Sequence, residues 1–159
     1  MTIQSILVLL GFVGACALAA SVGAVFRPGI WYERLVKPSW RPPNSVFAPV
    51  WAVLYLSIAV SGWLVWRTSG FTGATLPLVV YGIQLTLNAA WPAIFFGLHR
   101  IGLAFVEIVV LWVAIVTTIA LFFPVQPAAS LLLLPYLAWV SFAVALNHAV
   151  RRLNHASNP

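Results

Sequence analysis

The stretch IGLAFVEIVVLWVAIVTTIALFF, residues 101–123, decides the class of this protein. It carries a single charged residue, Glu107, and about 20 consecutive apolar residues are enough for a helix to cross the hydrocarbon of a bilayer. The whole chain has this character, because 63% of its 159 residues are hydrophobic and 6% are charged. A soluble domain averages about 25% charged residues. So few charges could not cover a soluble surface, and we expect an all-α integral membrane protein.

Five apolar runs of spanning length follow one another along the chain. They cover about residues 3–26, 45–66, 76–97, 101–123 and 129–150. The first run begins without a basic segment, so we expect it to be a span and not a cleaved signal. The connections are short except for the loop 27–44. The sequence therefore predicts a single domain over 1–159, a bundle of five transmembrane helices with a structured first loop.

The positions of the cations test this count. With five spans, the first loop, the third loop and the C-terminus share one side of the membrane. That side receives Arg27, Arg34, Lys37, Arg41, Arg100, Arg151 and Arg152. Only Arg67 falls on the other side, and such a bias is typical of the cytoplasmic face. We expect the N-terminus outside and the C-terminus in the cytoplasm if the protein lies in an inner membrane; which bacterial membrane holds it stays open.

Several classes of function are disfavoured by the residues present. The net charge of +6 is scattered over loops and makes no basic stripe, so we expect no nucleic-acid partner. Cys16 is the single cysteine and the histidines fit no ligand spacing, so we expect no metal site. The histidines are His99, His148 and His155. No nucleophile motif or pair of neighbouring acids occurs, and we expect no catalytic residue and no obligatory cofactor.

The two acids stand far apart in the sequence, at Glu33 and Glu107. Glu107 falls on the fourth span, about two turns beyond Arg100. An acid within a membrane is a functional candidate by default. The interpretation that we favour from sequence is plainer: an acid near the interface that reaches water or pairs with a cation.

Eight tryptophans are present, and their depth suggests two roles. Trp63 and Trp66 end the second span and suit an interfacial belt. Trp31 and Trp40 in the loop fit a belt or a ligand site equally well. The deeper tryptophans need a partner for the indole N–H that lipid cannot offer, so they should face the bundle interior or a ligand. They are Trp51, Trp91, Trp112 and Trp139.

Helical spacing places aromatic and amide side chains on shared faces of three spans. These residues are Phe47, Trp51 and Tyr55 on the second span, Gln84, Asn88 and Trp91 on the third, and Trp139 with Ala143 on the fifth. Core packing alone could explain each set. Amides in the middle of a membrane are costly unless they are hydrogen-bonded inside the bundle, which favours a polar interior site.

The opposite face of the third span carries a stripe of small residues, Ala89, Ala93 and Gly97. Such stripes let helix backbones approach closely in membranes. The stripe predicts a contact with another helix, either in a second subunit or in the same bundle.

Residues 37–51, KPSWRPPNSVFAPVW, hold four prolines, two tryptophans and two cations. Proline fixes φ, so this segment keeps a defined shape. A long connection of fixed shape is more often a lid or a binding loop than a linker.

Four stretches of this sequence resemble the TspO/MBR family, also known as the translocator protein or peripheral-type benzodiazepine receptor family. They are WYERLVKPSWRPP from Trp31, VFAPVWAVLY to Tyr55, QLTLNAAWPAIFFG from Gln84 and LPYLAWVSFAVALN to Asn147. The match covers three of the five spans and the long loop, in the order of the family.

The resemblance implies a five-helix bundle, usually dimeric, that binds porphyrins such as protoporphyrin IX and haem-like tetrapyrroles. Animal members also bind cholesterol and synthetic drugs. The implied pocket residues are Trp51, Tyr55, Asn88, Trp91, Trp139 and Ala143, with Trp31, Trp40, Pro42 and Pro43 from the loop. His148 stands where the cholesterol-associated pattern has a tyrosine, which weakens the expectation of cholesterol binding.

A porphyrin is a flat aromatic disc with two carboxylates, and the loop has matching chemistry. Its cations Arg34, Lys37 and Arg41 could pair with the acids while its indoles stack on the disc. Alternatively, these cations set the topology and touch lipid headgroups. We expect a receptor or carrier for porphyrin-type ligands; a light-dependent porphyrin-degrading protein and a regulatory scaffold are the alternatives.

Overall fold

The computed structural model describes residues 2–155, all of them in helices or the short connections between helices. The elements are α1 (Ile3–Val25), α2 (Ile30–Arg34), α3 (Asn44–Gly73), α4 (Thr75–Pro92), the π-helix η1 (Ala93–Gly97), α5 (Ile101–Phe122) and α6 (Pro127–His155). Residues 1 and 156–159 and the side chain of His155 lie outside this description. Five helices are long and apolar enough to cross a membrane, so the predicted five-helix membrane fold is confirmed.

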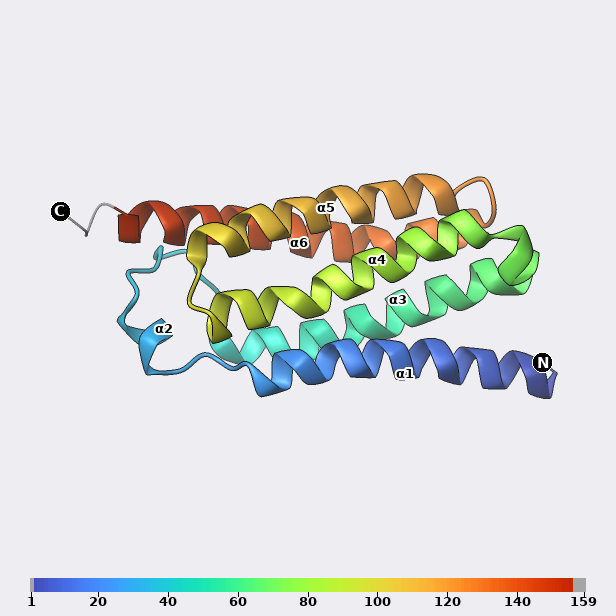
Figure 1. Cartoon of the computed structure of the whole chain (residues 1–159), viewed down its shortest axis with the longest axis horizontal. Helices are drawn as coiled ribbons and strands as arrows, with labels where there is room; N and C mark the ends of the chain where they lie inside the picture. The colour runs from blue at the N-terminus through green and yellow to red at the C-terminus, as the bar shows by residue number, and fades with distance from the viewer. Residues whose placement is uncertain (1, 156–159) are drawn as a thin grey trace.

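The five long helices lie side by side along the length of the molecule (Figure 1), and their contacts close into a ring. Around the ring, α1 packs on α3, α3 on α6, α6 on α5, α5 on α4, and α4 back on α1. The two described ends of the chain lie at opposite ends of the bundle. Helix α2 and the connection between η1 and α5 lie at the same end as the C-terminus, so the cations assigned to one side do share one end.

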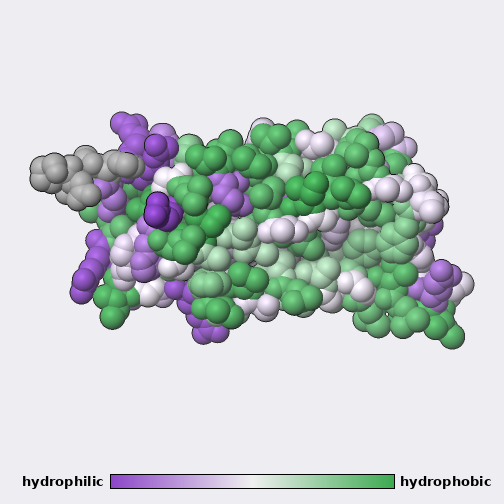
Figure 2. Space-filling model, viewed as in Figure 1, coloured by the Kyte–Doolittle hydropathy of each residue, from purple (hydrophilic) through white to green (hydrophobic). Residues whose placement is uncertain are grey.

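On the face shown in Figure 2, the surface of the bundle is predominantly apolar along its length, and hydrophilic residues gather toward its ends. Helix α1 shows this most clearly, because Leu7, Leu10 and Leu18 are all more than half exposed. Large apolar side chains on an outward face suit contact with lipid tails. The protein is therefore an integral, multi-pass membrane protein.

The helix ends differ from the predicted spans where local chemistry intervenes. Pro127 begins α6 two residues early, because a helix needs no N–H from its first residue. Helix α3 runs to Gly73, well past the predicted end at 66. Gly70 interrupts it with φ of 65°, a conformation that glycine adopts readily, so the chain bends there before α4.

Helix α4 widens at its C-terminal end into the π-helix η1. Pro92 has no N–H with which to continue the α-helical pattern, and the next turn has the longer π spacing. The amide of Leu98 then donates to the carbonyl of Ala93 at 2.9 Å, and His99 turns the chain with a φ of 55°. This turn carries the chain directly into α5.

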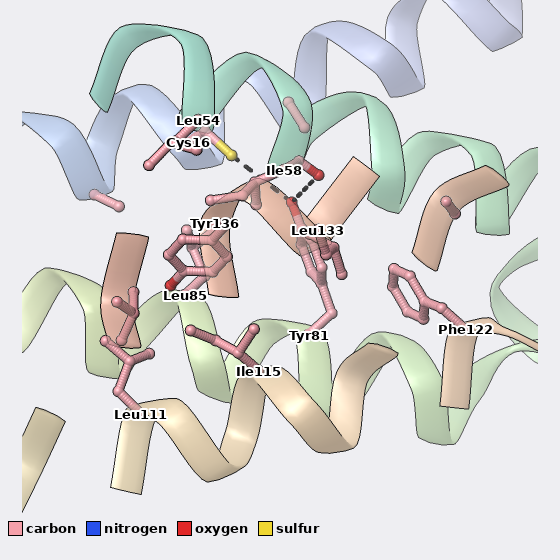
Figure 3. Close-up of a cluster of buried hydrophobic side chains, with 14 of the residues drawn as sticks. Cys16, Leu54, Ile58, Tyr81, Leu85, Leu111, Ile115, Phe122, Leu133 and Tyr136 are labelled. Carbon is pink, nitrogen blue, oxygen red and sulfur yellow. Dashed lines mark hydrogen bonds between the residues drawn. The ribbon is translucent and has the colours of Figure 1, made fainter. Parts of the chain in front are cut away.

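The half of the bundle remote from α2 has a filled core (Figure 3). Tyr81 stacks on Phe122 with ring centroids 5.9 Å apart, and its hydroxyl donates to the carbonyl of Ile58 at 3.2 Å. The thiol of Cys16 lies 3.7 Å from the same hydroxyl. Gly62 allows this packing, because a Cβ there would lie 2.7 Å from the ring of Phe12. Buried aromatic and aliphatic side chains from all five long helices form this core.

The first loop is folded, as predicted, and it is tied to the last helix. The backbone of Val36 exchanges two hydrogen bonds with the side-chain amide of Asn154, at 3.0 Å and 2.9 Å. Within the loop, Tyr32 of α2 is buried and packs on Phe95 and Phe96. We refer to the pair Val36–Asn154 as the loop clamp. It fixes the loop over the end of the bundle.

Candidate ligand-binding site

A cavity of about 770 Å³ lies inside the ring of helices, at the end covered by the loop. All five long helices, η1 and the loop contribute to its wall. The lining residues are Ala20, Gly23, Ala24, Phe26, Arg27, Pro28, Tyr32, Asn44, Phe47, Ala48, Trp51, Ala52, Tyr55, Asn88, Trp91, Pro92, Phe95, Phe96, Ile108, Leu111, Trp139, Val140, Ala143, Leu146, Asn147 and Val150. This volume is typical of small-molecule sites, and the predominantly apolar wall suits a hydrophobic ligand.

Aromatic rings form much of the cavity wall. Trp51 lies against Tyr55 with ring centroids 5.4 Å apart, and Phe47 meets the edge of Trp139 at 5.6 Å. On the facing side, Trp91 stacks on Phe95 at 4.9 Å. Neighbouring rings restrict one another, so their faces and edges are held in place for a flat aromatic guest.

A chain of hydrogen bonds closes the inner end of the cavity. Tyr55 donates to the Oδ1 atom of Asn88 at 2.6 Å, and the Nδ2 atom of Asn88 donates to the hydroxyl of Tyr136 at 2.7 Å. Tyr136 in turn donates to Oε1 of Gln84 at 3.0 Å. We call these four residues the floor network. Most of its polar atoms satisfy one another, which makes it a rigid floor.

The mouth of the cavity carries positive charge. Arg27, just after α1, lines the wall, and its Nε atom donates to the carbonyl of Ala24 at 2.6 Å. Lys37 and Arg41 do not reach the wall; their charged groups lie 4.7 Å and 5.8 Å from the ring centroid of Tyr32, which does line it. Loss of hydration and the charge of Arg41 lower the pKa of Lys37. Lys37 and Arg41 therefore pack against Tyr32, the loop residue that covers the cavity.

Besides Nε2 of Gln84 in the floor network, three buried groups in or near the cavity wall have no hydrogen-bond partner among the described residues. They are the indole N–H of Trp91, both polar atoms of the Asn147 side chain and both carboxylate oxygens of Glu107. Trp91 and Asn147 line the cavity directly, and Glu107 comes just before the lining residue Ile108. Buried polar groups are nearly always paired in proteins, so unpaired groups beside a cavity mark a place where a ligand or water can bind.

Comparison with known proteins agrees with this architecture. The sequence model of the TspO/MBR family matches residues 7–153. The chain belongs to the TspO/MBR family. It is 44% identical over 151 residues to the translocator protein of Homo sapiens, covering 92% of this chain and 89% of that protein.

Bacterial members of the TspO/MBR family match equally well. The tryptophan-rich protein TspO of Chlorobaculum tepidum is 41% identical over 155 residues, which is 95% of this chain and 98% of that protein. Protein CrtK of Rhodobacter capsulatus is 41% identical over 149 residues, 91% of each chain. The resemblance recognised from the sequence motifs is thus confirmed over nearly the whole chain.

The structure brings the predicted TspO/MBR pocket residues of the long helices, except Gln84, to one cavity, and it leaves the predicted residues of the loop off the cavity wall. Those on the cavity are Phe47, Trp51, Tyr55, Asn88, Trp91, Trp139 and Ala143. Gln84 lies behind Tyr136 in the floor network and does not line the cavity. The other predicted residues that stay off the wall are Trp31, Trp40, Pro42, Pro43, Arg34, Lys37 and Arg41.

The loop residues off the wall have other contacts in this TspO/MBR chain. Trp31 stacks on His99 with ring centroids 4.2 Å apart. Trp40 is 50% exposed and touches the edge of Phe142, while Pro43 precedes the first turn of α3. These contacts hold the loop on the side away from the cavity. The sequence could not predict which loop residues face the cavity, because a proline-rich segment has no helical periodicity. Sequence reasoning missed Arg27 and Tyr32 as wall residues for the same reason.

Two interpretations from sequence need correction, and a third is decided between its alternatives. Trp63 is buried and donates its indole N–H to the carbonyl of Ser5 at 3.1 Å, so it is not a belt residue. Glu107 is 8% exposed and neither reaches water nor pairs with a cation in the described part of the chain. Trp112, expected toward the bundle interior or a ligand, packs against the core and donates to Ser141 on α6 at 2.8 Å, off the cavity wall, which agrees with the first alternative.

The small stripe of α4 and η1 has neighbours in its own chain. A Cβ at Gly97 would lie 2.8 Å from the ring of Phe26, and Ala89 packs against the core. The wider turn of the π-helix also rotates Gly97 away from the line through Ala89 and Ala93. The internal alternative therefore explains part of the stripe, and contact with a second subunit stays a prediction.

Proposed function

We propose that this protein is a membrane receptor or carrier that binds porphyrin-type tetrapyrroles in the cavity beneath the first loop. The observation that carries the proposal is the cavity itself: about 770 Å³, walled by the rings of Trp51, Trp91 and Trp139. A tetrapyrrole disc buries its faces against such rings. The residues that line the cavity include no nucleophile motif and no pair of acids, so ligand binding explains the site better than acid–base catalysis.

The charge at the mouth supports a carboxylated ligand. Arg27 on the cavity wall can pair with one carboxylate of a porphyrin whose ring lies deeper, between the tryptophans. The mouth lies at the cation-rich end of the bundle, which would raise the local concentration of anionic ligands. The loop, held by the clamp and by the contacts of Tyr32, would cover the bound disc.

A tryptophan-fluorescence titration of the purified protein with protoporphyrin IX tests the proposal. We expect saturable quenching that depends on Trp51 and Trp139 and persists in Trp66→Phe, because Trp66 lies away from this cavity. Absence of saturable quenching in the unaltered protein would refute porphyrin binding.

A second candidate function, light-dependent degradation of the bound porphyrin, is favoured by the two indoles of Trp51 and Trp139 on one cavity wall. The absorbing group would be the ligand, so no acid–base residue is required. Illumination of the complex distinguishes the two functions. A new chromophore that forms with the native protein and not with Trp139→Phe supports degradation, whereas unchanged porphyrin supports a receptor or carrier.

Two further proposals concern assembly and orientation. We infer that the C-terminus faces the cytoplasm, because the cations gather at that end of the bundle. Reporter fusions at the two termini test this.

We also infer a homodimer that uses Ala93 on α4 and η1. Ala93→Leu should break the dimer and leave ligand binding intact, as read by cross-linking and titration; a persistent dimer would place the interface elsewhere.

A further inference from the structure

The polar groups without hydrogen-bond partners in and beside the cavity are unusual, because buried polar groups are nearly always paired. Asn147 is 3% exposed, and both its donor and its acceptor lack a partner among residues 2–155. Glu107 is 8% exposed with both oxygens unpartnered, and Trp91 lines the cavity with an unpartnered N–H. The floor network differs, since the hydroxyls of Tyr55 and Tyr136 both donate within it. Nε2 of Gln84 is the one floor atom without a partner among the described residues, and Gln84 lies behind Tyr136 and off the cavity wall. The capacity for new hydrogen bonds on the cavity therefore lies mainly in its side wall.

The packing of α5 on α6 places two of these groups at the same level. Trp112 of α5 donates to Ser141 of α6 at 2.8 Å, and the ring of Phe105 lies 5.4 Å from that of His148. In each pair the residue numbers rise on one helix as they fall on the other, so the helices are antiparallel. In this register Glu107 lies opposite the step from Leu146 to Asn147.

Trp91 of α4 reaches the same level from another side. It packs, together with Leu146, on the buried cluster that contains Phe95, Ala104 and Val150. Glu107 follows Ala104 by one helical turn, and Leu111, one turn further on, lines the cavity. Three helices thus bring a donor, an amide and a carboxyl group to one level, between the mouth and the floor.

The chemistry of the three groups defines what they could bind. The indole of Trp91 only donates, the amide of Asn147 donates and accepts, and the carboxyl of Glu107 offers two acceptor oxygens. Their complement is a ligand edge on which a carbonyl stands beside N–H groups, as in a lactam. A closed porphyrin macrocycle has no ring carbonyl, since its C=O groups belong to the propionate side chains, and its N–H groups point to its centre. An open-chain tetrapyrrole ends in lactam rings, and its pyrrole N–H groups lie along the accessible edge.

We propose that Glu107, Asn147 and Trp91 form a polar subsite that binds the lactam edge of an open-chain tetrapyrrole. This inference rests on the proposed function, because it assumes that the cavity takes tetrapyrroles. It narrows that function: the aromatic wall would accept both ring forms, and the subsite would recognise only the open one. A group that is unpartnered in the free protein is matched when such a ligand enters.

Biliverdin and protoporphyrin IX are suitable probes, since both carry two propionates and differ in the lactam edge. Each is titrated into the unaltered full-length protein, Asn147→Leu and Glu107→Gln, with tryptophan quenching as the readout. We expect Asn147→Leu to weaken biliverdin binding about tenfold, equivalent to about 1.4 kcal/mol, and to change protoporphyrin binding less than about twofold. Glu107→Gln, which keeps one carbonyl acceptor, should weaken biliverdin about threefold. Trp66→Phe, which changes a residue away from this cavity, should not separate the probes.

The outcomes separate this inference from the proposed function. Equal losses for both probes, or failure of biliverdin to bind while protoporphyrin binds, would overturn the subsite and leave the proposed function standing. If neither probe binds the unaltered protein, both ideas fall. If Asn147→Leu does not fold, the infrared band of the lactam carbonyl decides in the unaltered protein and Asn147→Gln. A band that shifts on binding and differs between the two proteins supports the subsite; identical bands overturn it.

Discussion

The two halves of the bundle are built from the same helices but treat their polar groups in opposite ways. In the filled half, Ser61 donates to the carbonyl of Ala129 at 2.8 Å, and Ser130 donates to that of Ile119 at 2.9 Å. In the hollow half, Trp91 and Asn147 line the cavity with unpartnered groups. The paired polar groups of the filled half stabilise the fold, whereas the unpartnered groups of the hollow half can still bind a ligand. Substitutions should therefore separate the two halves cleanly.

The largest expected effect lies in the filled half. Phe122→Ala removes a fully buried ring that stacks on Tyr81, and it should lower the free energy of unfolding by about 3 kcal/mol. Phe47→Ala is the matched change in the hollow half, where the ring already borders open space and loses fewer contacts. Unfolding in detergent measures both. Similar losses of stability would show that the two halves are not distinct.

The next effect should appear in ligand affinity. Trp139→Ala removes a ring from the cavity wall and should weaken porphyrin binding about tenfold or more, with a small change in stability. Trp66→Ala provides the control, since this indole lies at the opposite end. Porphyrin titration and thermal unfolding of both variants check the prediction. An effect of Trp66→Ala as large as that of Trp139→Ala would contradict it.

A smaller effect is expected at the mouth. Arg27→Gln should weaken binding of the free porphyrin diacid about fivefold, and it should leave binding of the dimethyl ester unchanged because the ester has no charge to pair. Arg152→Gln removes a cation that lies at the same end of the bundle but away from the cavity wall. Titration of both ligands into both variants distinguishes a direct contact with Arg27 from the general electrostatic field of the cations at this end. Equal losses in the two variants would argue for the field.

The smallest effect should come from the loop. Replacing Pro42 and Pro43 with glycine frees the chain before α3 and should weaken ligand binding by about 1 kcal/mol, through a less ordered loop. Ser39→Gly in the same loop is the control, since it removes no proline. Titration and limited proteolysis report on affinity and on loop order. Faster proteolysis with unchanged affinity would show that the stiffness of the loop serves another purpose.

Much of the fold and part of the site could be predicted from the sequence, because both follow from helical periodicity in an apolar chain. The spacing of Trp51 with Tyr55, and of Asn88 with Trp91, places each pair on one face, and the structure puts all four on the cavity wall. Gln84 has the same spacing but lies behind Tyr136. Periodicity identifies the inward face of a helix. It cannot show which of the inward side chains lines the cavity and which is covered by a neighbour.

Other parts of the site depend on partners that periodicity does not reveal. Glu107 was assigned to the interface because most acids find water or a cation, and the packing of α5 on α6 denies it both. The π-helix after Pro92 rotates Gly97 out of its expected stripe. Arg27 follows the last turn of α1, where no helical face applies. Each of these outcomes is set by tertiary contacts or by a local change in helix type.

The loop clamp has a consequence for how the protein is made. It joins Val36 to Asn154, two residues 118 positions apart, so the loop gains its anchor only after the last helix has been synthesised. Until then, the first four spans can insert and pack while the mouth of the cavity stays without its fastened cover. Closure of the binding site by the loop clamp therefore has to wait until α6 has been made and packed.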